Sequence, residues 1–326
     1  MYILIGMLIL IVVAGFRSSS VGTDTNNYVY IFKSINIYNI GKGSTSLEYL
    51  YVILNKIAYL FSEDYISLLI SIAIITIYFD IKVISKLSDN LWLSIFLYIT
   101  LGGYVFFFNG ARQAIAVAIF GMAILQIINK NLKWYIFWVF IAALFHKTAI
   151  LMFPFYFFNF KKFSLKRSVT IGFIFTVLFM FFSIVLNFFS DQISKEYLVY
   201  ENRNASGAYI LTVFYFINTI FLIYLKNTIS ILYLKKYSFC LNLCVFQTLI
   251  YIVVQITGID INLIRLASYF QLGFILIYPI IFKEFKIFKD IFPRLLFLGV
   301  HILFYYVYLG KMSNLVPYTF NPILNF

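Results

Sequence analysis

Residues 108–125, "FNGARQAIAVAIFGMAIL", decide the fold class of this chain, because they form an apolar run of membrane-spanning length. Arg112 stands near the start of this run, although a charged side chain costs about 2.5–3.5 kcal/mol at the centre of a bilayer. The cost falls at the mouth of a helix, where the guanidinium reaches water. The stretch therefore predicts a transmembrane helix with Arg112 at its outer end.

The whole chain repeats this pattern. Its 326 residues are 63% hydrophobic and 11% charged, against roughly 45–50% and 25% in soluble proteins. We expect spans at 1–16, 65–84, 91–108, 109–129, 134–160, 168–189, 209–225, 237–257, 264–282 and 294–310. The sequence thus predicts an all-α polytopic integral membrane protein, which we interpret as GT-C-like. Residues 1–326 form a single integral domain with about ten or eleven transmembrane helices.

The net charge of +13 has a topological explanation. The basic residues are scattered between apolar spans and form no basic face, so no nucleic-acid partner is expected. Lys-rich loops are typical of the cytoplasmic side of a membrane, which places the N-terminus inside.

The segment 134–160 allows two interpretations. It either crosses the membrane once as a tilted helix or forms a hairpin of two short helices bent around His146 and Lys147. Only the hairpin puts the basic residues that follow on the same side as the other Lys-rich loops. We therefore favour the hairpin. It places four basic residues on the cytoplasmic side: Lys161, Lys162, Lys166 and Arg167.

The opposite, outer side collects four polar stretches. They are "FRSSSVGTDTNNY" from Phe16, "FNGARQ" from Phe108, "LFHKTA" from Leu144 and "GIDINLIRLASYF" from Gly258. Two outer loops are expected, at about 17–64 and about 190–208. The first carries an interfacial amphipathic helix at 47–61, which includes Glu48 and Lys56.

Two of these stretches share a local pattern. Asn109 and Asn262 are candidate N-caps, each followed three residues later by an arginine, Arg112 or Arg265. A helix N-terminus with a bidentate arginine suits a phosphate, and two such ends facing one cavity suit a pyrophosphate.

Each candidate also has a structural interpretation. In this interpretation Arg112 or Arg265 is a snorkelling anchor at the interface. His146 is then a turn residue, and Asp24 folds its loop through an Asx-turn. Arg203, in the second outer loop, is then a solvated residue.

The chain resembles the EpsG family of bacterial exopolysaccharide proteins, which is similar in role to the Wzy-type polymerases. The motifs that carry the resemblance, in this order and with long apolar spacing, are "FRSSSVGTDTNNY", "FNGARQAIAVAIF", "ALFHKTAILMFP" and "NLIRLASYF". The resemblance covers Phe16 to about Phe270. It implies a metal-independent and cofactor-independent glycosyltransferase of the bacterial cytoplasmic membrane, with its active site facing outside. The implied donor and acceptor are oligosaccharide repeat units on undecaprenyl pyrophosphate, joined by inverting-type displacement of the lipid pyrophosphate. The implied neighbours are a flippase and a chain-length regulator.

The resemblance and the chemistry together assign roles. Arg112, Arg265 and Arg17 would bind the pyrophosphate leaving group. His146 would be the general base, with Asp24 as its rival. The remaining candidates would contact substrate: Gln113, Tyr28, Tyr269, Lys147 and Arg203.

Two further classes of membrane protein compete with this interpretation. A lipid-linked oligosaccharide flippase would also need cations for pyrophosphate, and a membrane acyltransferase that modifies polysaccharide could use His and Arg. A flippase is often built from repeated halves with charges at mid-depth. The sequence has no such repeat, and its polar stretches lie toward one face, so we favour the polymerase.

Overall fold

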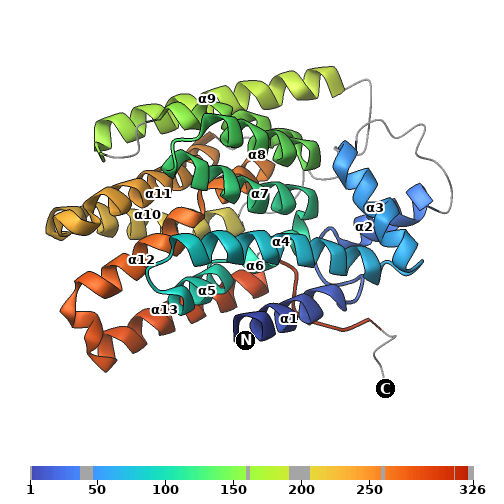
Figure 1. Ribbon diagram of the computed structural model, residues 1–326, viewed down its shortest axis with the longest axis horizontal. Coiled ribbons are helices and arrows are strands. Elements are labelled where there is room, and N and C mark those ends of the chain that lie inside the picture. The colour runs from blue at the N-terminus through green and yellow to red at the C-terminus, as the bar shows by residue number, and fades with distance from the viewer. Residues whose placement is uncertain are drawn as a thin grey trace. The chain divides into compact units, whose positions relative to one another are not determined.

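The computed structural model describes residues 2–36, 47–158, 162–190, 206–257, 261–311 and 313–321 (Figure 1). Within these ranges the chain is helical and holds no strand, only one isolated antiparallel bridge between Arg17 and Phe320. The predicted all-α polytopic class is confirmed. Arg203, in the predicted second outer loop, and Asp260, in the fourth polar stretch, lie outside the described ranges.

The α-helices are α1 (Tyr2–Gly15), α2 (Thr25–Asn36), α3 (Tyr49–Phe61), α4 (Ile66–Leu87), α5 (Leu91–Thr100), α6 (Gly103–Asn109), α7 (Ala111–Ile128), α8 (Leu132–Phe145), α9 (Leu165–Ser190), α10 (Ser206–Leu225), α11 (Ile231–Thr257), α12 (Leu272–Glu284) and α13 (Ile291–Lys311). The 3₁₀ segments are η2 (Lys147–Phe157), η4 (Lys226–Thr228), η5 (Ile261–Phe270) and η6 (Lys286–Lys289).

Six helical stretches of the described chain are long and apolar enough to cross a membrane: Ile66–Leu87, Leu91–Asn109, Ala111–Ile128, Tyr209–Thr228, Ile231–Thr257 and Ile291–Lys311. The predicted span 264–282 corresponds to a pair of apolar helices, Ile264–Phe270 and Leu272–Glu284, bent by 44°. Helix α1, which we expected to span, and helix α8, the first arm of the expected hairpin, have 14 residues each. That is shorter than the roughly 20 residues that a perpendicular crossing needs.

The chain divides into two compact units. Unit 1 holds Met1–Lys86, Ile99–Tyr156 and Leu303–Phe326, and unit 2 holds Leu87–Tyr98 and Phe157–Ile302. In unit 1, α7 packs against α6 and α8, while α3 contacts both α2 and α8. In unit 2, α11 is the central helix and contacts α9, α10, α12 and η5.

Helices α11 and α12 lie very close to each other at Gly273. A Cβ atom there would lie 2.7 Å from Leu243 Cβ, 2.8 Å from the Cys240 carbonyl oxygen and 2.9 Å from the Cys244 backbone nitrogen. Glycine is needed because two of these neighbours are backbone atoms of α11 that cannot move aside. Cys240 and Cys244 are buried in this interface, which explains why small residues occupy both positions.

The segment after α8 folds back as a hairpin. Helix α8 ends at Phe145, and His146 is extended, with φ −156° and ψ 119°. Near the start of α8, the Tyr135 hydroxyl donates to the Met152 carbonyl oxygen, and its ring lies 5.2 Å from the ring of Tyr156. A continuous helix would separate these residues by about 30 Å. The prediction of a hairpin around His146 is confirmed.

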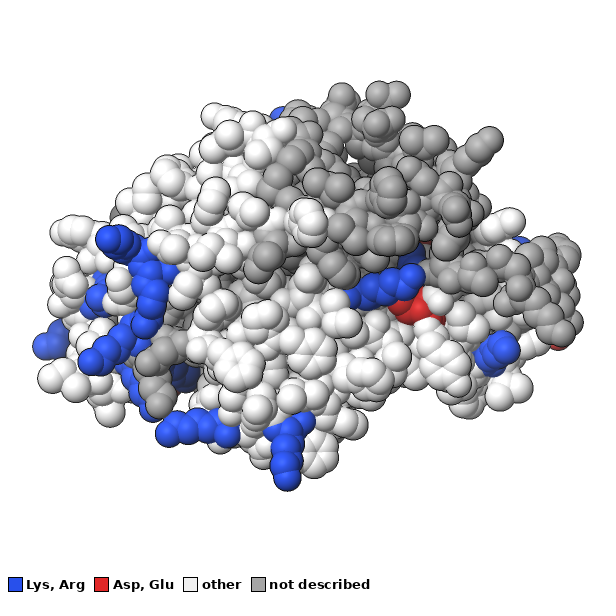
Figure 2. Space-filling view, turned by 90° about the horizontal axis from the view of Figure 1, so that it is seen from above, with Lys and Arg blue, Asp and Glu red and all other residues white. Residues whose placement is uncertain are grey.

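One end of unit 2 is strongly basic. Lys226 Nζ lies 3.4 Å from the Phe163 carbonyl oxygen, so the start of α9 meets the end of α10. The Ser230 backbone nitrogen donates to Glu284 Oε2 at 2.8 Å, which joins the start of α11 to the end of α12. These helix ends carry Lys162, Lys166, Arg167, Lys226, Lys235, Lys236, Lys283, Lys286 and Lys289. The gathering of basic side chains toward the left of Figure 2 follows from this arrangement, and it matches the predicted grouping of these loops.

The C-terminal segment 313–321 pairs with the N-terminal loop of unit 1. The Ser18 backbone nitrogen donates to the Thr319 carbonyl oxygen at 2.9 Å, and the Asn321 nitrogen donates to the Phe16 carbonyl oxygen at 2.8 Å. Farther along, the Gly22 nitrogen donates to the Asn314 carbonyl oxygen at 3.0 Å. Residues from both ends of the chain therefore build one polar end of unit 1.

Candidate functional site

A buried carboxylate joins two of the predicted site residues in unit 1. Arg112 Nη1 donates to Glu48 Oε2 at 2.7 Å, and His146 Nδ1 lies 3.1 Å from Glu48 Oε1. The Glu48 side chain is 6% exposed, whereas those of Arg112 and His146 are 24% and 22% exposed. We call these three residues the Glu48 cluster.

Three helix ends place the members of the Glu48 cluster. Glu48 directly precedes α3, and its carbonyl oxygen accepts from the backbone nitrogens of Tyr51 and Val52, both at 3.1 Å. Arg112 is the second residue of α7. His146 ends α8 at the hairpin turn, where its backbone nitrogen donates to the Ala142 carbonyl oxygen at 2.9 Å. The contacts of α8 with both α3 and α7 bring these ends together.

An aromatic ring supports the guanidinium of Arg112. Its Cζ lies 5.9 Å from the centroid of Tyr51, the third residue of α3, and the Tyr51 side chain is buried. A cation over an aromatic face at this distance is attracted by the ring quadrupole. Helix α3 therefore provides both the carboxylate next to its start and the ring beside Arg112.

Glu48 is ionised at every physiological pH. Burial alone would raise the pKa of its carboxyl, but the hydrogen bond with His146 and the positive charges of Arg112 and His146 lower the pKa to about 2. An ionised carboxylate only accepts hydrogen bonds, so we assign the proton on the His146 ring to Nδ1 from this partner. The basic nitrogen of the neutral ring is then Nε2.

Arg17 lies at the same end of unit 1 but in a separate, fully buried position. Its Nη1 donates to the Ala14 carbonyl oxygen at 2.6 Å, its Nε donates to Thr25 Oγ1 at 3.3 Å, and its Cζ lies 4.4 Å from the ring centroid of Phe108. Burial lowers the pKa of Arg17 to about 10, which still leaves it positively charged at neutral pH. The structure therefore gives Arg17 an internal role, and a pyrophosphate could reach it only if these contacts opened.

Asn109 is not an N-cap, so this prediction is wrong. It is the last residue of α6, and Gly110 occupies the N-cap position of α7. The Asn109 side chain instead accepts from the Thr23 backbone nitrogen at 2.7 Å and donates to the Ser313 carbonyl oxygen at 2.6 Å. The Asn109 side-chain amide is therefore hydrogen-bonded to two loops that are distant in sequence, and it does not cap α7.

The loop around Asp24 packs on the start of α7. The Tyr28 hydroxyl accepts from the Ala111 backbone nitrogen at 2.8 Å, which satisfies a free N–H of the first turn. Tyr28 is buried, so this bond is its observed role. Asp24 is also buried, and its Oδ1 accepts from the Thr23 hydroxyl at 3.0 Å. Gly22 has a φ of 94°, and a Cβ there would lie 2.8 Å from Asn109 Oδ1.

The other predicted substrate contacts divide between the units. In unit 1, Gln113 is buried in α7 and Lys147 is exposed at the start of η2. In unit 2, Arg265 is half-buried and Tyr269 is buried, both in η5. Asn262, the other candidate N-cap, is the second residue of η5. The structure thus brings three of the four polar stretches to one end of unit 1, and the fourth belongs to unit 2.

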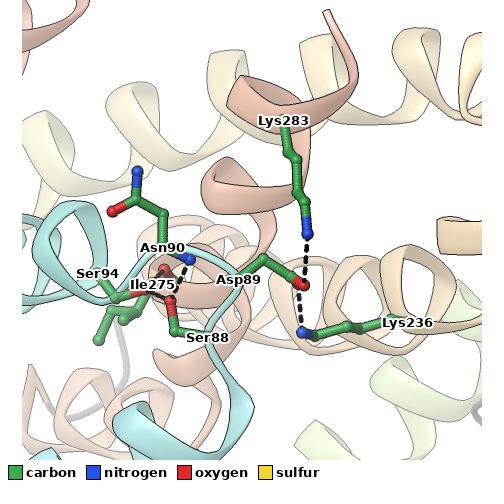
Figure 3. A network of polar contacts seen from close by, with 7 residues as sticks. All are labelled: Ser88, Asp89, Asn90, Ser94, Lys236, Ile275 and Lys283. Carbon is green, nitrogen blue, oxygen red and sulfur yellow. Dashed lines mark hydrogen bonds and ion pairs between the residues drawn. The ribbon is translucent and has the colours of Figure 1, made fainter.

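A second charged cluster lies at the basic end of unit 2 (Figure 3). Asp89, in the turn between α4 and α5, pairs with Lys236 of α11 and lies 4.0 Å from Lys283 Nζ of α12. The neighbouring Ser94 hydroxyl donates to the Ile275 carbonyl oxygen at 3.0 Å. The Asp89 carboxylate lies between these two lysines and links the turn to α11 and α12. This role is structural.

Glu48 is the site residue that sequence reasoning missed. The sequence shows it only as a charge on an amphipathic helix, because nothing in the local sequence separates it from the other acidic residues. The one available signal is its position just before a helix whose residues Tyr51, Leu54, Asn55 and Ala58 share a buried face. That face directs the start of α3 into the protein.

Among the residues that the structure describes, no group of three His, Cys, Asp or Glu side chains could hold a metal ion. The Glu48 cluster is instead a set of organic hydrogen-bonding groups, with two partly exposed cationic or basic side chains around a buried anion.

Comparison with known proteins identifies the family. The sequence matches the EpsG family over residues 1–320, nearly the whole chain. No curated protein and no solved structure matches it. Helices of membrane-spanning length and this match together show that the chain is a multi-pass membrane protein of the EpsG family.

Proposed function

We propose that this protein is a polysaccharide polymerase that joins oligosaccharide repeat units carried on undecaprenyl pyrophosphate. The observation that carries the proposal is the meeting of Arg112 and His146, from two separate polar stretches, at one buried carboxylate. A phosphate-binding cation and a general base are the two groups that glycosyl transfer from a lipid pyrophosphate requires. Membership of the EpsG family supports the same activity.

The reaction needs one bond formed and one broken. A hydroxyl of the acceptor sugar attacks the anomeric carbon of the donor chain, and a new glycosidic C–O bond forms with inversion. The bond between the anomeric carbon and the pyrophosphate oxygen breaks, and the lipid pyrophosphate leaves with the electron pair. His146 Nε2 takes the hydroxyl proton and later returns it to solvent.

Arg112 stabilises the departing pyrophosphate. Negative charge on the bridging oxygen grows in the transition state, so a fixed guanidinium lowers the barrier most when it is already oriented. Arg265 is the proposed second cation. Gln113, Lys147, Tyr269 and Arg203 remain proposed substrate contacts. Asp24 is the rival base, although its carboxylate already accepts from Thr23.

We place the Glu48 cluster at the outer face of the cytoplasmic membrane. Independently of that placement, the positive-inside rule favours the cytoplasmic side for the basic end of unit 2. A Lys162→Cys variant tests the placement of this basic end, because a membrane-impermeant thiol reagent should label it only from the cytoplasmic side. Labelling from outside would contradict that placement.

Reconstitution tests the activity. The purified protein in liposomes, given a lipid-pyrophosphate-linked repeat unit alone, should produce a ladder of longer glycans and release undecaprenyl pyrophosphate. No nucleotide sugar, metal, flippase or chain-length regulator is added. Movement of the lipid across the bilayer without elongation would reject the polymerase in favour of a flippase. Transfer of an acyl group from an added acyl donor would favour the acyltransferase.

A further inference from the structure

We infer that Glu48 is a positioning residue that holds the side chains of Arg112 and His146 in one shared geometry. This inference rests on the proposed function of these two residues and extends it to a third residue that touches no substrate. Glu48 differs from a catalytic residue because its side chain is 6% exposed and each of its two oxygens already has a partner.

The two oxygens of Glu48 act on different elements. Oε2 binds Arg112 of α7, and Oε1 binds His146 at the end of α8. A single rigid carboxylate therefore fixes the direction from the guanidinium to the imidazole. Neither partner can rotate away without losing a charge-assisted hydrogen bond, which is shorter and stronger than a neutral one.

Arg112 gains most from this restraint, because a free arginine side chain has many rotamers. Glu48 binds it at Nη1, and the Tyr51 ring lies beside it at 5.9 Å. A guanidinium has five N–H donors, so Arg112 can bind more than one partner at once. With 24% of the side chain exposed, Arg112 remains reachable for an anion from solvent.

His146 gains a defined tautomer. The carboxylate at Nδ1 selects the ring form with its proton on that nitrogen, and its negative charge stabilises the imidazolium that forms when Nε2 takes a proton. The charged groups near His146 include Glu48 next to α3, Arg112 of α7, which shares Glu48 with it, and the adjacent Lys147. Both neighbouring cations disfavour a protonated ring, so Glu48 supplies the opposing charge.

A merely structural ion pair would have different consequences. Loss of such a pair lowers stability but leaves kcat and the pH profile of the reaction unchanged. Loss of a positioning residue lowers kcat more than it raises KM, and it shifts the pH at which His146 titrates.

The test compares Glu48→Gln and Glu48→Asp with the wild-type protein, and Glu63→Gln serves as the matched control. Glu63 lies just beyond the other end of α3 and is exposed. Glu48→Gln should lower kcat by about 10- to 100-fold, and the acidic limb of its kcat profile should move to lower pH. Glu48→Asp keeps the charge, so its acidic limb should stay near the wild-type position. Glu63→Gln should match the wild type in both respects.

A second measurement does not depend on polymerase activity. Diethyl pyrocarbonate modifies neutral imidazoles, and mass spectrometry can follow the modification of His146 separately from that of His301. The pH dependence of this reaction should move to lower pH in Glu48→Gln and stay in place in Glu63→Gln. An unshifted curve in folded Glu48→Gln overturns the positioning role. If the wild-type protein makes no polymer but the modification curve of His146 still shifts in Glu48→Gln, the proposed function is rejected and the role of Glu48 is retained.

Discussion

The buried Glu48 carboxylate predicts a specific dependence of stability on pH. Its pKa is lowered from the usual 4.5 to about 2 in the folded protein. At about 1.36 kcal/mol for each pH unit, this difference corresponds to roughly 3 kcal/mol of folding free energy. Because the folded pKa lies below the unfolded one, this contribution is fully present above pH 4.5. It is lost as the pH falls toward 2.

A Glu48→Gln variant isolates this contribution, because glutamine has nearly the shape of the protonated acid but never ionises. At pH 7 the variant should be less stable by roughly 3 kcal/mol, or about 5–10 °C in Tm. The difference from the wild type should shrink below pH 4.5 and almost vanish near pH 2. Tryptophan fluorescence during heating in a mild detergent, repeated from pH 7 to pH 2.5, measures both curves.

Two results would refute this reasoning. A difference that stays constant from pH 7 to pH 2.5 would mean that the Glu48 carboxylate does not titrate as a partner of Arg112 and His146. No difference at pH 7 would mean that the ionised Glu48 carboxylate stabilises the fold no more than the glutamine amide does. Glu63→Gln, whose side chain is exposed, should follow the wild type at every pH.

Three further substitutions test other parts of the structure. Arg112→Lys keeps the charge but loses the planar fork of the guanidinium, so polymer formation in the reconstituted assay should fall by at least about 100-fold. Near-normal polymer formation would instead make Arg112 an interfacial anchor. The control is Arg294→Lys, at an exposed arginine. Arg17→Ala removes a fully buried side chain and its hydrogen bonds, and should lower stability by roughly 2–4 kcal/mol in thermal unfolding; an unchanged Tm would contradict its internal role. Gly273→Ala should lower stability by about 1–3 kcal/mol because a backbone lies within 3 Å of the new methyl group. Gly299→Ala, which meets nothing within 4 Å, should be neutral or slightly stabilising.

The sequence predicts the helices well because their signal is local. Apolar runs mark most helices to within a few residues, and the polar pair His146–Lys147 marks the hairpin turn between α8 and η2. The loop expected at about 17–64 is less well predicted, since it also contains α2. That helix is amphipathic and short, so its polar face resembles a loop in the sequence.

The candidate site is only partly visible in the sequence. Arg112 and His146 stand out because a charged or titratable group beside an apolar run requires an explanation. Glu48 does not stand out, because its importance comes from contacts 64 and 98 residues away in the chain. Asn109 is wrongly predicted as an N-cap for the same reason, because its side chain hydrogen-bonds to Thr23 and Ser313, which are distant in the chain.

The pairing between the two chain ends has a consequence for biosynthesis. Ser18 and Gly22 are translated long before their backbone partners, Thr319 and Asn314. The loop that carries Arg17 and Asp24 therefore lacks these hydrogen bonds until the segment after α13 has been made. The polar end of unit 1 is thus completed only after α13 is in place, so a chain that stops before α13 would lack these backbone contacts.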